Sequence, residues 1–156
     1  MRKPILLALT FISACALAGG AATNAATTTI DLATSGSVVP TIWSADVGQE
    51  LAFLFTTTNK STTASAELNV TFTVKNGIVR NSDYICNLIS NHHAINPDTP
   101  SCEPGLLGPA KATRNAILVT AIATGTMTVR ACSTAINGYS DPVSSNNCKT
   151  LSVRIV

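Results

Sequence analysis

Charged side chains are scarce in this chain. Only 12% of its 156 residues are Asp, Glu, Lys or Arg, whereas a globular protein usually carries about 25%. The ten basic and eight acidic residues nearly balance, which excludes a nucleic-acid-binding protein with a basic face, an acidic tail and a charge-rich disordered chain. Aromatic residues are also scarce, at 4%, so an aromatic platform for carbohydrates or stacked bases is not supported.

The motifs of common catalytic sites are missing as well. No G-x-S-x-G elbow, H-E-x-x-H pair, S-x-x-K motif or Gly-rich phosphate loop occurs. The only histidines, His92 and His93, are adjacent, and neighbours on an extended chain point to opposite sides, so they cannot readily bind one metal ion. We therefore predict no enzyme, no catalytic residue, no metal and no cofactor. A small metal-dependent hydrolase centred on His92 and His93 is the enzymatic alternative.

The first 26 residues have the layout of a secretory signal peptide. Arg2 and Lys3 precede an almost uninterrupted apolar run that ends at Ala18, and small residues follow it. The apolar run is too short to span a membrane comfortably. We expect cleavage after Ala18 or Ala25, which leaves a mature domain over residues 27–156 with equal numbers of basic and acidic residues and no membrane span.

A second processing route is open at Cys15. The sequence Ile12-Ser13-Ala14-Cys15 resembles a bacterial lipobox, in which Cys15 would become the lipidated first residue. Ile stands where Leu is preferred, and the residues after Cys15 are more apolar than usual. We therefore favour free secretion, periplasmic residence or display at the cell surface, with a lipoprotein as the alternative.

Four cysteines remain without Cys15, namely Cys86, Cys102, Cys132 and Cys148. An even number in an exported chain indicates two disulfides, because the compartment outside the cytoplasm is oxidising. Four cysteines allow three connectivities, and we favour the sequential pairs 86–102 and 132–148 because they close two loops of equal, moderate size. A zinc site is disfavoured because the chain has no C-x-x-C pair.

Alternation of apolar and polar residues dominates the mature chain, and no stretch of a dozen residues shows helical spacing. Threonine is abundant in the alternating segments, and its β-branched side chain fits a pleated surface. About seven strands without helices predict an all-β fold, an antiparallel two-sheet Ig-like sandwich with one core. The clearest predicted strands are Leu51–Thr58, Leu68–Val74, Ala116–Thr124, Thr126–Thr134 and Leu151–Ile155.

Turn residues separate these segments. Asn76-Gly77 and Asn137-Gly138 predict hairpin turns, because Asn and Gly both tolerate positive φ. Residues 91–112 are rich in proline and contain no long apolar run. We expect them to form a long irregular excursion that the 86–102 disulfide closes at its base.

Asp141-Pro142 predicts another turn, because an Asp side chain bonds the local backbone and Pro removes a donor. The functional alternative is a Ca²⁺ loop built from oxygens of Asp141, Asn146 and Asn147. Tyr84 stands two residues before a cysteine, like the tyrosine corner of antibody domains, but the mature chain has no earlier cysteine to complete that motif. We expect Tyr84 and Trp43 to be ordinary core aromatics.

This succession of strands and turns resembles the bacterial Ig-like "conserved repeat" domain over most of residues 28–156. The resemblance implies a domain of secreted and cell-surface proteins, often in tandem, without a defined activity. The chain departs from the family at Lys60-Ser61 and at Val74-Lys75-Asn76-Gly77, and the Cys132–Cys148 pair is not a usual family feature. The matching segments are Val47-Gly48-Gln49-Glu50, Leu51–Asn59, Leu68–Val74, Ala116–Thr124, Gly125-Thr126, Ser140-Asp141-Pro142, Asn146-Asn147 and Thr150–Val156.

Together these observations predict an exported, non-catalytic structural or interaction module of the bacterial envelope or exterior. Its partner would be a protein or a matrix component, bound through strand edges and loops on a rigid sandwich, and not a nucleic acid. The alternative is a pilus-type subunit in which Thr27–Ala33 completes a neighbour's sheet by strand addition. The complete-looking last strand, Thr150–Val156, argues against that alternative.

Overall fold

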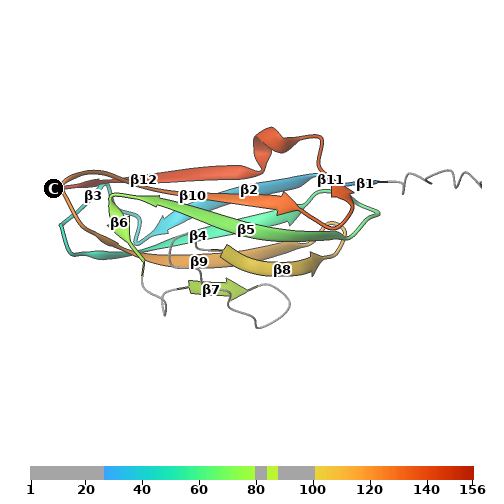
Figure 1. Ribbon diagram of the computed structural model, residues 1–156. Coiled ribbons are helices and arrows are strands. Elements are labelled where there is room, and N and C mark those ends of the chain that lie inside the picture. Colours follow the sequence, from blue (N-terminus) through green and yellow to red (C-terminus); the bar gives the residue numbers. More distant parts are fainter. Residues whose placement is uncertain (1–26, 80–83, 88–100) are drawn as a thin grey trace, which may run out of the picture.

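The computed structural model describes residues 27–79, 84–87 and 101–156 (Figure 1). The predicted signal peptide with Cys15 therefore lies outside the described residues. So do His92 and His93, and so do the side chains of Tyr84 and Cys86.

The described residues form strands and one 3-10 turn, without an α-helix. Each strand predicted from the alternation is present. Their order is β1 (Thr28–Thr29), β2 (Leu32–Val39), β3 (Ser44–Ala45), β4 (Glu50–Asn59), β5 (Ala66–Lys75), β6 (Gly77–Ile78), β7 (Tyr84–Asn87), β8 (Ser101–Leu107), β9 (Ala112–Ala121), β10 (Gly125–Ala135), β11 (Tyr139–Ser140), η1 (Ser144–Asn146) and β12 (Cys148–Ile155).

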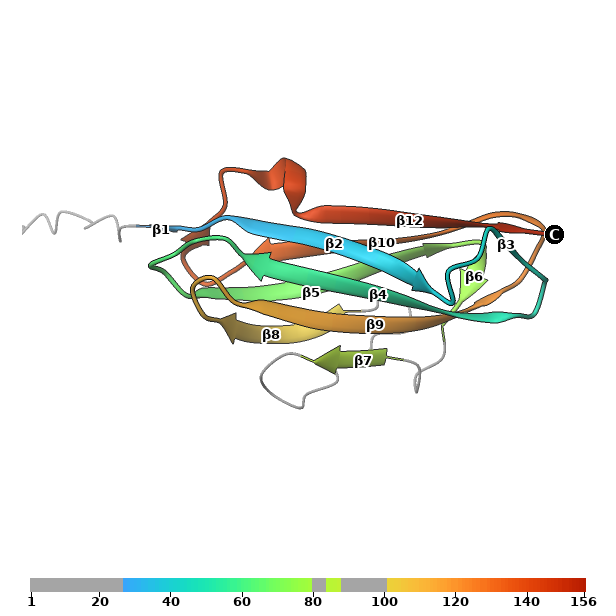
Figure 2. The same ribbon diagram turned by 180° about the vertical axis from the view of Figure 1, so that it is seen from behind.

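Two five-stranded sheets face each other and form a sandwich. Sheet 1 has the order β2-β4-β9-β6, with β7 also paired to β9, and sheet 2 has the order β3-β12-β10-β5-β8. All pairs between the long strands are antiparallel, so the predicted antiparallel sandwich is confirmed. The orders β2-β4-β9 and β12-β10-β5 correspond to strands A-B-E and G-F-C of an immunoglobulin sandwich. Figure 2 shows β2 and β12 along the same side of the two layers.

The core lies between the sheets and is filled by every second residue of the long strands. In β4, buried and less buried positions alternate from Glu50 to Asn59, because successive side chains of a strand point to opposite faces. The rings of Phe55 and Phe72 meet across the gap with centroids 5.7 Å apart. Sheet 1 contributes Leu32, Leu51, Phe53, Phe55, Ile117 and Val119, and sheet 2 contributes Leu68, Val70, Phe72, Met127, Val129 and Ile155.

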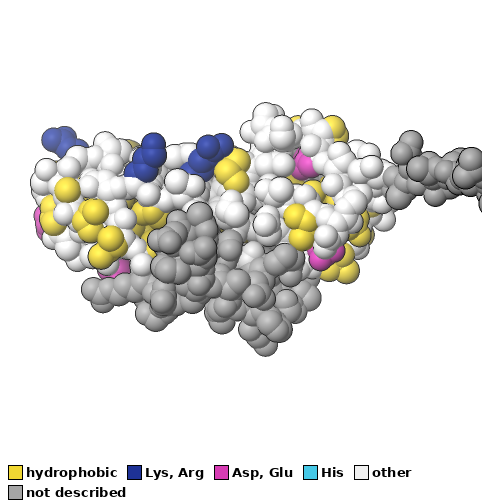
Figure 3. Space-filling view, viewed as in Figure 1, with side chains coloured by type: hydrophobic (Ala, Val, Ile, Leu, Met, Phe, Trp, Pro, Cys, Tyr) yellow, Lys and Arg dark blue, Asp and Glu magenta, His cyan; other side chains and the backbone are white. Residues whose placement is uncertain are grey.

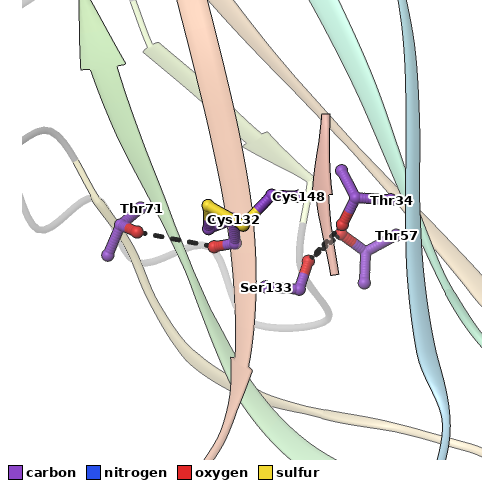
Figure 4. Close-up of a disulfide and its surroundings, with 6 residues drawn as sticks. All are labelled: Thr34, Thr57, Thr71, Cys132, Ser133 and Cys148. Atoms are coloured by element: carbon purple, nitrogen blue, oxygen red, sulfur yellow. Dashed lines mark hydrogen bonds between the residues drawn. A yellow bond between two sulfur atoms is a disulfide. The ribbon is translucent and has the colours of Figure 1, made fainter. Parts of the chain in front are cut away.

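Three hydroxyl groups form a hydrogen-bonded cluster inside this apolar core (Figure 4). Ser133 Oγ of β10 lies 2.8 Å from Thr34 Oγ1 of β2 and 2.6 Å from Thr57 Oγ1 of β4. All three residues are buried, so each hydroxyl would lose solvation without a partner. The cluster thus joins the two sheets by polar contacts close to the Cys132–Cys148 disulfide.

The predicted irregular excursion over residues 91–112 is wrong for its second part. Residues 101–107 form β8, and β9 begins at Ala112. Pro104 and Gly105 concealed this strand in the sequence, but Pro is tolerated where a strand has a neighbour on one side only. Among the described strands, β8 pairs with β5 alone, at the edge of sheet 2, and the register shifts between Leu68 and Val70 of β5.

The hairpin predicted at Asn76-Gly77 is also wrong. Asn76 has the expected positive φ of 57°, but the chain leaves sheet 2 there and enters sheet 1 as β6. The turn is therefore a corner between layers. Gly77 is required by close packing, because a Cβ at this position would collide with the Val119 and Met127 side chains.

A turn is present at Asn137-Gly138, but the hairpin predicted there is wrong. Both residues have positive φ, 55° and 85°, and the Tyr139 amide donates to the Ile136 carbonyl over 3.3 Å. The strand that follows, β11, pairs with β1 and not with β10, so this turn too connects different sheets.

The hydroxyl cluster predicts the effect of a one-atom deletion. Ser133→Ala should lower the free energy of unfolding by about 1–3 kcal/mol, because the Thr34 and Thr57 hydroxyls lose their buried partner. Chemical denaturation of the disulfide-bonded protein measures this change. Ser152→Ala, the same substitution at an exposed position of β12, is the control and should change stability little. Equal losses in the two variants would contradict the role of the cluster.

Candidate functional site

Cys132 and Cys148 form a disulfide, as predicted from their spacing (Figure 4). They are directly opposite in the register of β10 and β12. The bond fastens the start of the last strand to its neighbour, next to Ser133 of the hydroxyl cluster.

The second predicted disulfide is described at one end only. Cys102, buried on β8, is disulfide-bonded, and its Sγ lies 3.6 Å from Asn115 Oδ1 of β9. The backbone of Cys86 on β7 stands opposite Asn115. Both cysteines therefore flank the same residue, which supports the pairing 86–102 and would link the edges of the two sheets.

Asp141 forms the predicted turn and also ties the segment between β11 and β12 to the start of β2 in sheet 1. Its Oδ1 accepts a hydrogen bond from the Val143 amide at 2.9 Å, and its Oδ2 accepts one from the Leu32 amide at 2.8 Å. Asn146 donates to Asp31 at 2.9 Å and adds a second tie. These contacts give Asp141 a structural role, and the Ca²⁺ loop of Asp141, Asn146 and Asn147 stays an untested alternative.

Groups suited to acid–base or metal chemistry are not assembled in the part of the chain that the structure describes. No group of three or more His, Cys, Asp or Glu could hold a metal ion there. A cavity of about 560 Å³ lies over sheet 1, but Arg114 is its only ionisable lining residue. The predicted catalytic alternative at His92 and His93 lies outside the described residues.

The most unusual feature of the described surface is an apolar end, which we call the apolar pole. It lies where β3, β6 and the end of the chain marked C come together (Figure 1). Apolar side chains gather at this end in Figure 3. Each of its six large side chains is between 45% and 95% exposed. They are Val39, Trp43, Val47, Ile78, Ile122 and Val156.

Backbone hydrogen bonds between short segments hold the apolar pole together. The Gly48 amide donates to Ala121 and the Val156 amide donates to Ala45, both over 2.9 Å. Ile78 pairs with Thr120, at the end of β9. The pole therefore belongs to the rigid sandwich, although its side chains point away from the core.

The prediction that Trp43 is a core aromatic is wrong. Trp43 is 95% exposed, and it stands in the linker between β2 and β3. Its neighbour Ile42 packs partly against the core, so the side chain of Trp43 is directed outward. Alternation within strands could not reveal this position, because it lies outside every strand.

Comparisons with known proteins show the fold alone. No family model matches the chain, and no curated protein sequence matches it. The solution structure of the CARDB domain of PF1109 from Pyrococcus furiosus is similar, with 14% identity, a TM-score of 0.56, and coverage of 83% of this chain and 97% of that one. BslA, a bacterial hydrophobin, has 16% identity and a TM-score of 0.52 over 81% and 95% of the chains.

A third neighbour is BcpA, the major pilin subunit of Bacillus cereus, with 8% identity and a TM-score of 0.50 over 81% of this chain and 40% of that one. The described residues contain no helix able to cross a membrane. What the geometry and the comparisons establish is an all-β sandwich with a disulfide between β10 and β12, similar in fold to these three proteins.

The pairing of Cys86 with Cys102 can be tested by peptide mapping. Proteolysis of the non-reduced protein should release one cross-linked peptide pair containing Cys86 and Cys102 and another containing Cys132 and Cys148. The expected reason is that Cys86 and Cys102 flank Asn115 from the two sheet edges. A free Cys86 thiol, or a cross-link from Cys102 to any other cysteine, would contradict the pairing.

Proposed function

We propose that this protein is an exported, non-catalytic Ig-like module of the bacterial envelope or exterior, and that it binds a partner through its apolar pole. The observation that carries the proposal is the gathering of six exposed, large apolar side chains at one end of a rigid sandwich. Contiguous exposed apolar surface is costly in water and marks interaction sites in soluble proteins.

Export is supported by two independent features. The chain begins with the charge and apolar pattern of a signal peptide, and a disulfide joins β10 and β12. Disulfides persist in oxidising compartments outside the cytoplasm. The shared fold of a bacterial hydrophobin and a pilin subunit agrees with a place in the envelope or outside the cell.

The described surface supports a non-catalytic role. Among the described residues that line the cavity over sheet 1 there is no Asp, Glu, His, Cys or Lys to activate a hydroxyl. The six exposed apolar side chains of the pole can bury area against a partner.

The pilus-type alternative receives no support from the strand pairing. Within the segment Thr27–Ala33, β1 pairs with β11 and the start of β2 pairs with β4 of the same chain. The segment is therefore already used inside its own sandwich. The last strand, β12, is likewise paired with β10 along its whole length.

Export makes a prediction about the mass of the protein recovered outside the cytoplasm. We expect a chain that starts after Ala18 or Ala25 and lacks two hydrogens for each of two disulfides. A mass with an acyl-modified Cys15 would show the lipoprotein route instead. A full-length, reduced chain confined to the cytoplasm would contradict the export proposal.

Binding through the apolar pole makes a second prediction. Trp43→Ser/Ile122→Ser should weaken association of the mature domain with cell envelopes at least about tenfold, because a buried large apolar side chain contributes about 1.5–3 kcal/mol. Co-sedimentation with envelope fractions measures the change. Leu106→Ser, on β8 and 53% exposed, is the matched control outside the pole. Unchanged association in the double variant would contradict the proposal.

A further inference from the structure

We propose that the apolar pole docks on an anionic lipid bilayer, with Trp43 in the headgroup region and with Lys75, Arg130 and Arg154 over lipid phosphates. This inference rests on the proposed function, since it names the partner of the same surface. It is carried by the position of the pole, its size and the placement of charge beside it.

The pole is one end of the sandwich, where apolar side chains are exposed. Its members come from strand ends and from the short segments that connect strands, gathered at the chain terminus (Figure 1). None of the six side chains lines the cavity over sheet 1, and none lines a second cavity of about 430 Å³ beside the Cys132–Cys148 disulfide. An exposed apolar end needs a surface that can close around it, and the interfacial layer of a bilayer is such a surface.

The size of the pole argues against a second copy of the chain as its main partner. Six large side chains form the pole, whereas a stable protein interface takes about 20–30 residues from each side. A bilayer has no such requirement, because it accepts a few apolar side chains together with a neighbouring basic surface. Trp is also enriched where membranes meet water.

Positive charge runs from the pole along the outer face of sheet 2. Residues 126, 128 and 130 of β10 point outward, because buried Met127 and Val129 alternate with them. Each of the three, together with the residues paired to it on the neighbouring strands, forms a row across the outer face of sheet 2. Arg154 stands in the first row, Lys75 in the second and Arg130 in the third. Figure 3 shows Lys and Arg side chains spaced along this side of the molecule.

Among the residues that the structure describes, no acidic residue interrupts these rows. Besides the three cations, they contain only Thr and Ser: Thr126, Thr128, Ser152, Thr73 and Thr150. Lys75, Arg130 and Arg154 are all exposed, and cations near an anionic leaflet are attracted to its negative surface potential.

The acidic residues at this end define the orientation of the docked molecule. Asp46 and Glu50 are both exposed; Glu50 begins β4 in sheet 1, and Asp46 lies in the turn that leads to it. They would repel an anionic surface. The outer face of sheet 2 is therefore the side that inclines toward the lipid.

The chain contains its own probe for this contact, because Trp43 is its only tryptophan. Purified, disulfide-bonded exported protein should show a blue shift of Trp43 emission with vesicles of phosphatidylcholine and phosphatidylglycerol. It should co-sediment with them. Vesicles of phosphatidylcholine alone should give a much weaker shift, and added salt should reduce binding to the anionic vesicles.

Two charge variants with equal loss of charge test the placement of the basic rows. Lys75→Gln/Arg130→Gln/Arg154→Gln should weaken partition into anionic vesicles at least about tenfold. Lys60→Gln/Lys111→Gln/Arg114→Gln removes three exposed cations that lie away from the pole and should change it less than about twofold. Equal effects in the two variants would overturn the proposal, since they would mean attraction by total charge.

An apolar variant that keeps Trp43 tests the pole itself. Ile122→Ser/Val156→Ser should reduce the emission shift and the partition, while thermal unfolding confirms an intact fold. Failure of the unmodified protein to bind anionic vesicles would overturn the lipid proposal. If the pole variants nevertheless lose envelope association, the proposed function stands with a protein partner. A shift of Trp43 emission with protein concentration alone would instead identify a second copy.

Discussion

Packing of the two sheets against each other is the constraint on which the rest of the molecule depends. The gap between them is filled by alternate residues of the six long strands, with Phe55 and Phe72 in contact across it. Interiors pack at nearly crystalline density, so the registers of β4, β5, β9 and β10 are fixed together. The outward positions of the strands face water. Threonine is common there because its β-branched side chain suits a strand and its hydroxyl is solvated. Variation of surface chemistry is consequently confined to outward rows, turns and the two ends.

The two ends are built differently. At the end where β1 enters, polar bonds close the structure: Asp141 accepts two backbone amides, and the Asn59 side chain donates to the Ala64, Leu107 and Gly108 carbonyls. The apolar pole has mainly backbone hydrogen bonds between its short segments. Its described side-chain hydrogen bonds are exposed ones, from Asn76 to the Ala123 carbonyl and from the Asp46 amide to Gln49. The large apolar side chains of this end project into solvent.

The sequence predicts most strands because alternation is a local property of the chain. It predicts the Cys132–Cys148 disulfide because the number and spacing of the cysteines limit how they can pair. Period-two alternation located β5, β10 and β12, dense apolar runs located β4 and β9, and the spacing of Cys132 and Cys148 predicted their disulfide. Alternation failed at β8, whose Pro104 is allowed only by its edge position, and at Gly77, whose role comes from side chains on β9 and β10. The prediction for Trp43 was wrong because a linker residue has no alternation to follow. Whether it points inward depends on the end of the sandwich that the linker crosses.

Residues 27–156 contain eight basic and eight acidic residues. This part of the molecule therefore has no net charge that could attract a partner over a long range. Any electrostatic preference must then come from local segregation. The outward rows of sheet 2 next to the pole carry Lys75, Arg130 and Arg154, while Glu50 begins β4 of sheet 1 and Asp46 lies in the turn between β3 and β4. Because charges separated by more than about 8 Å are largely screened at physiological ionic strength, such segregation matters only at the surface in contact. The apolar pole and the adjacent basic rows therefore act as one short-range binding surface, oriented by the fold that the core packing determines.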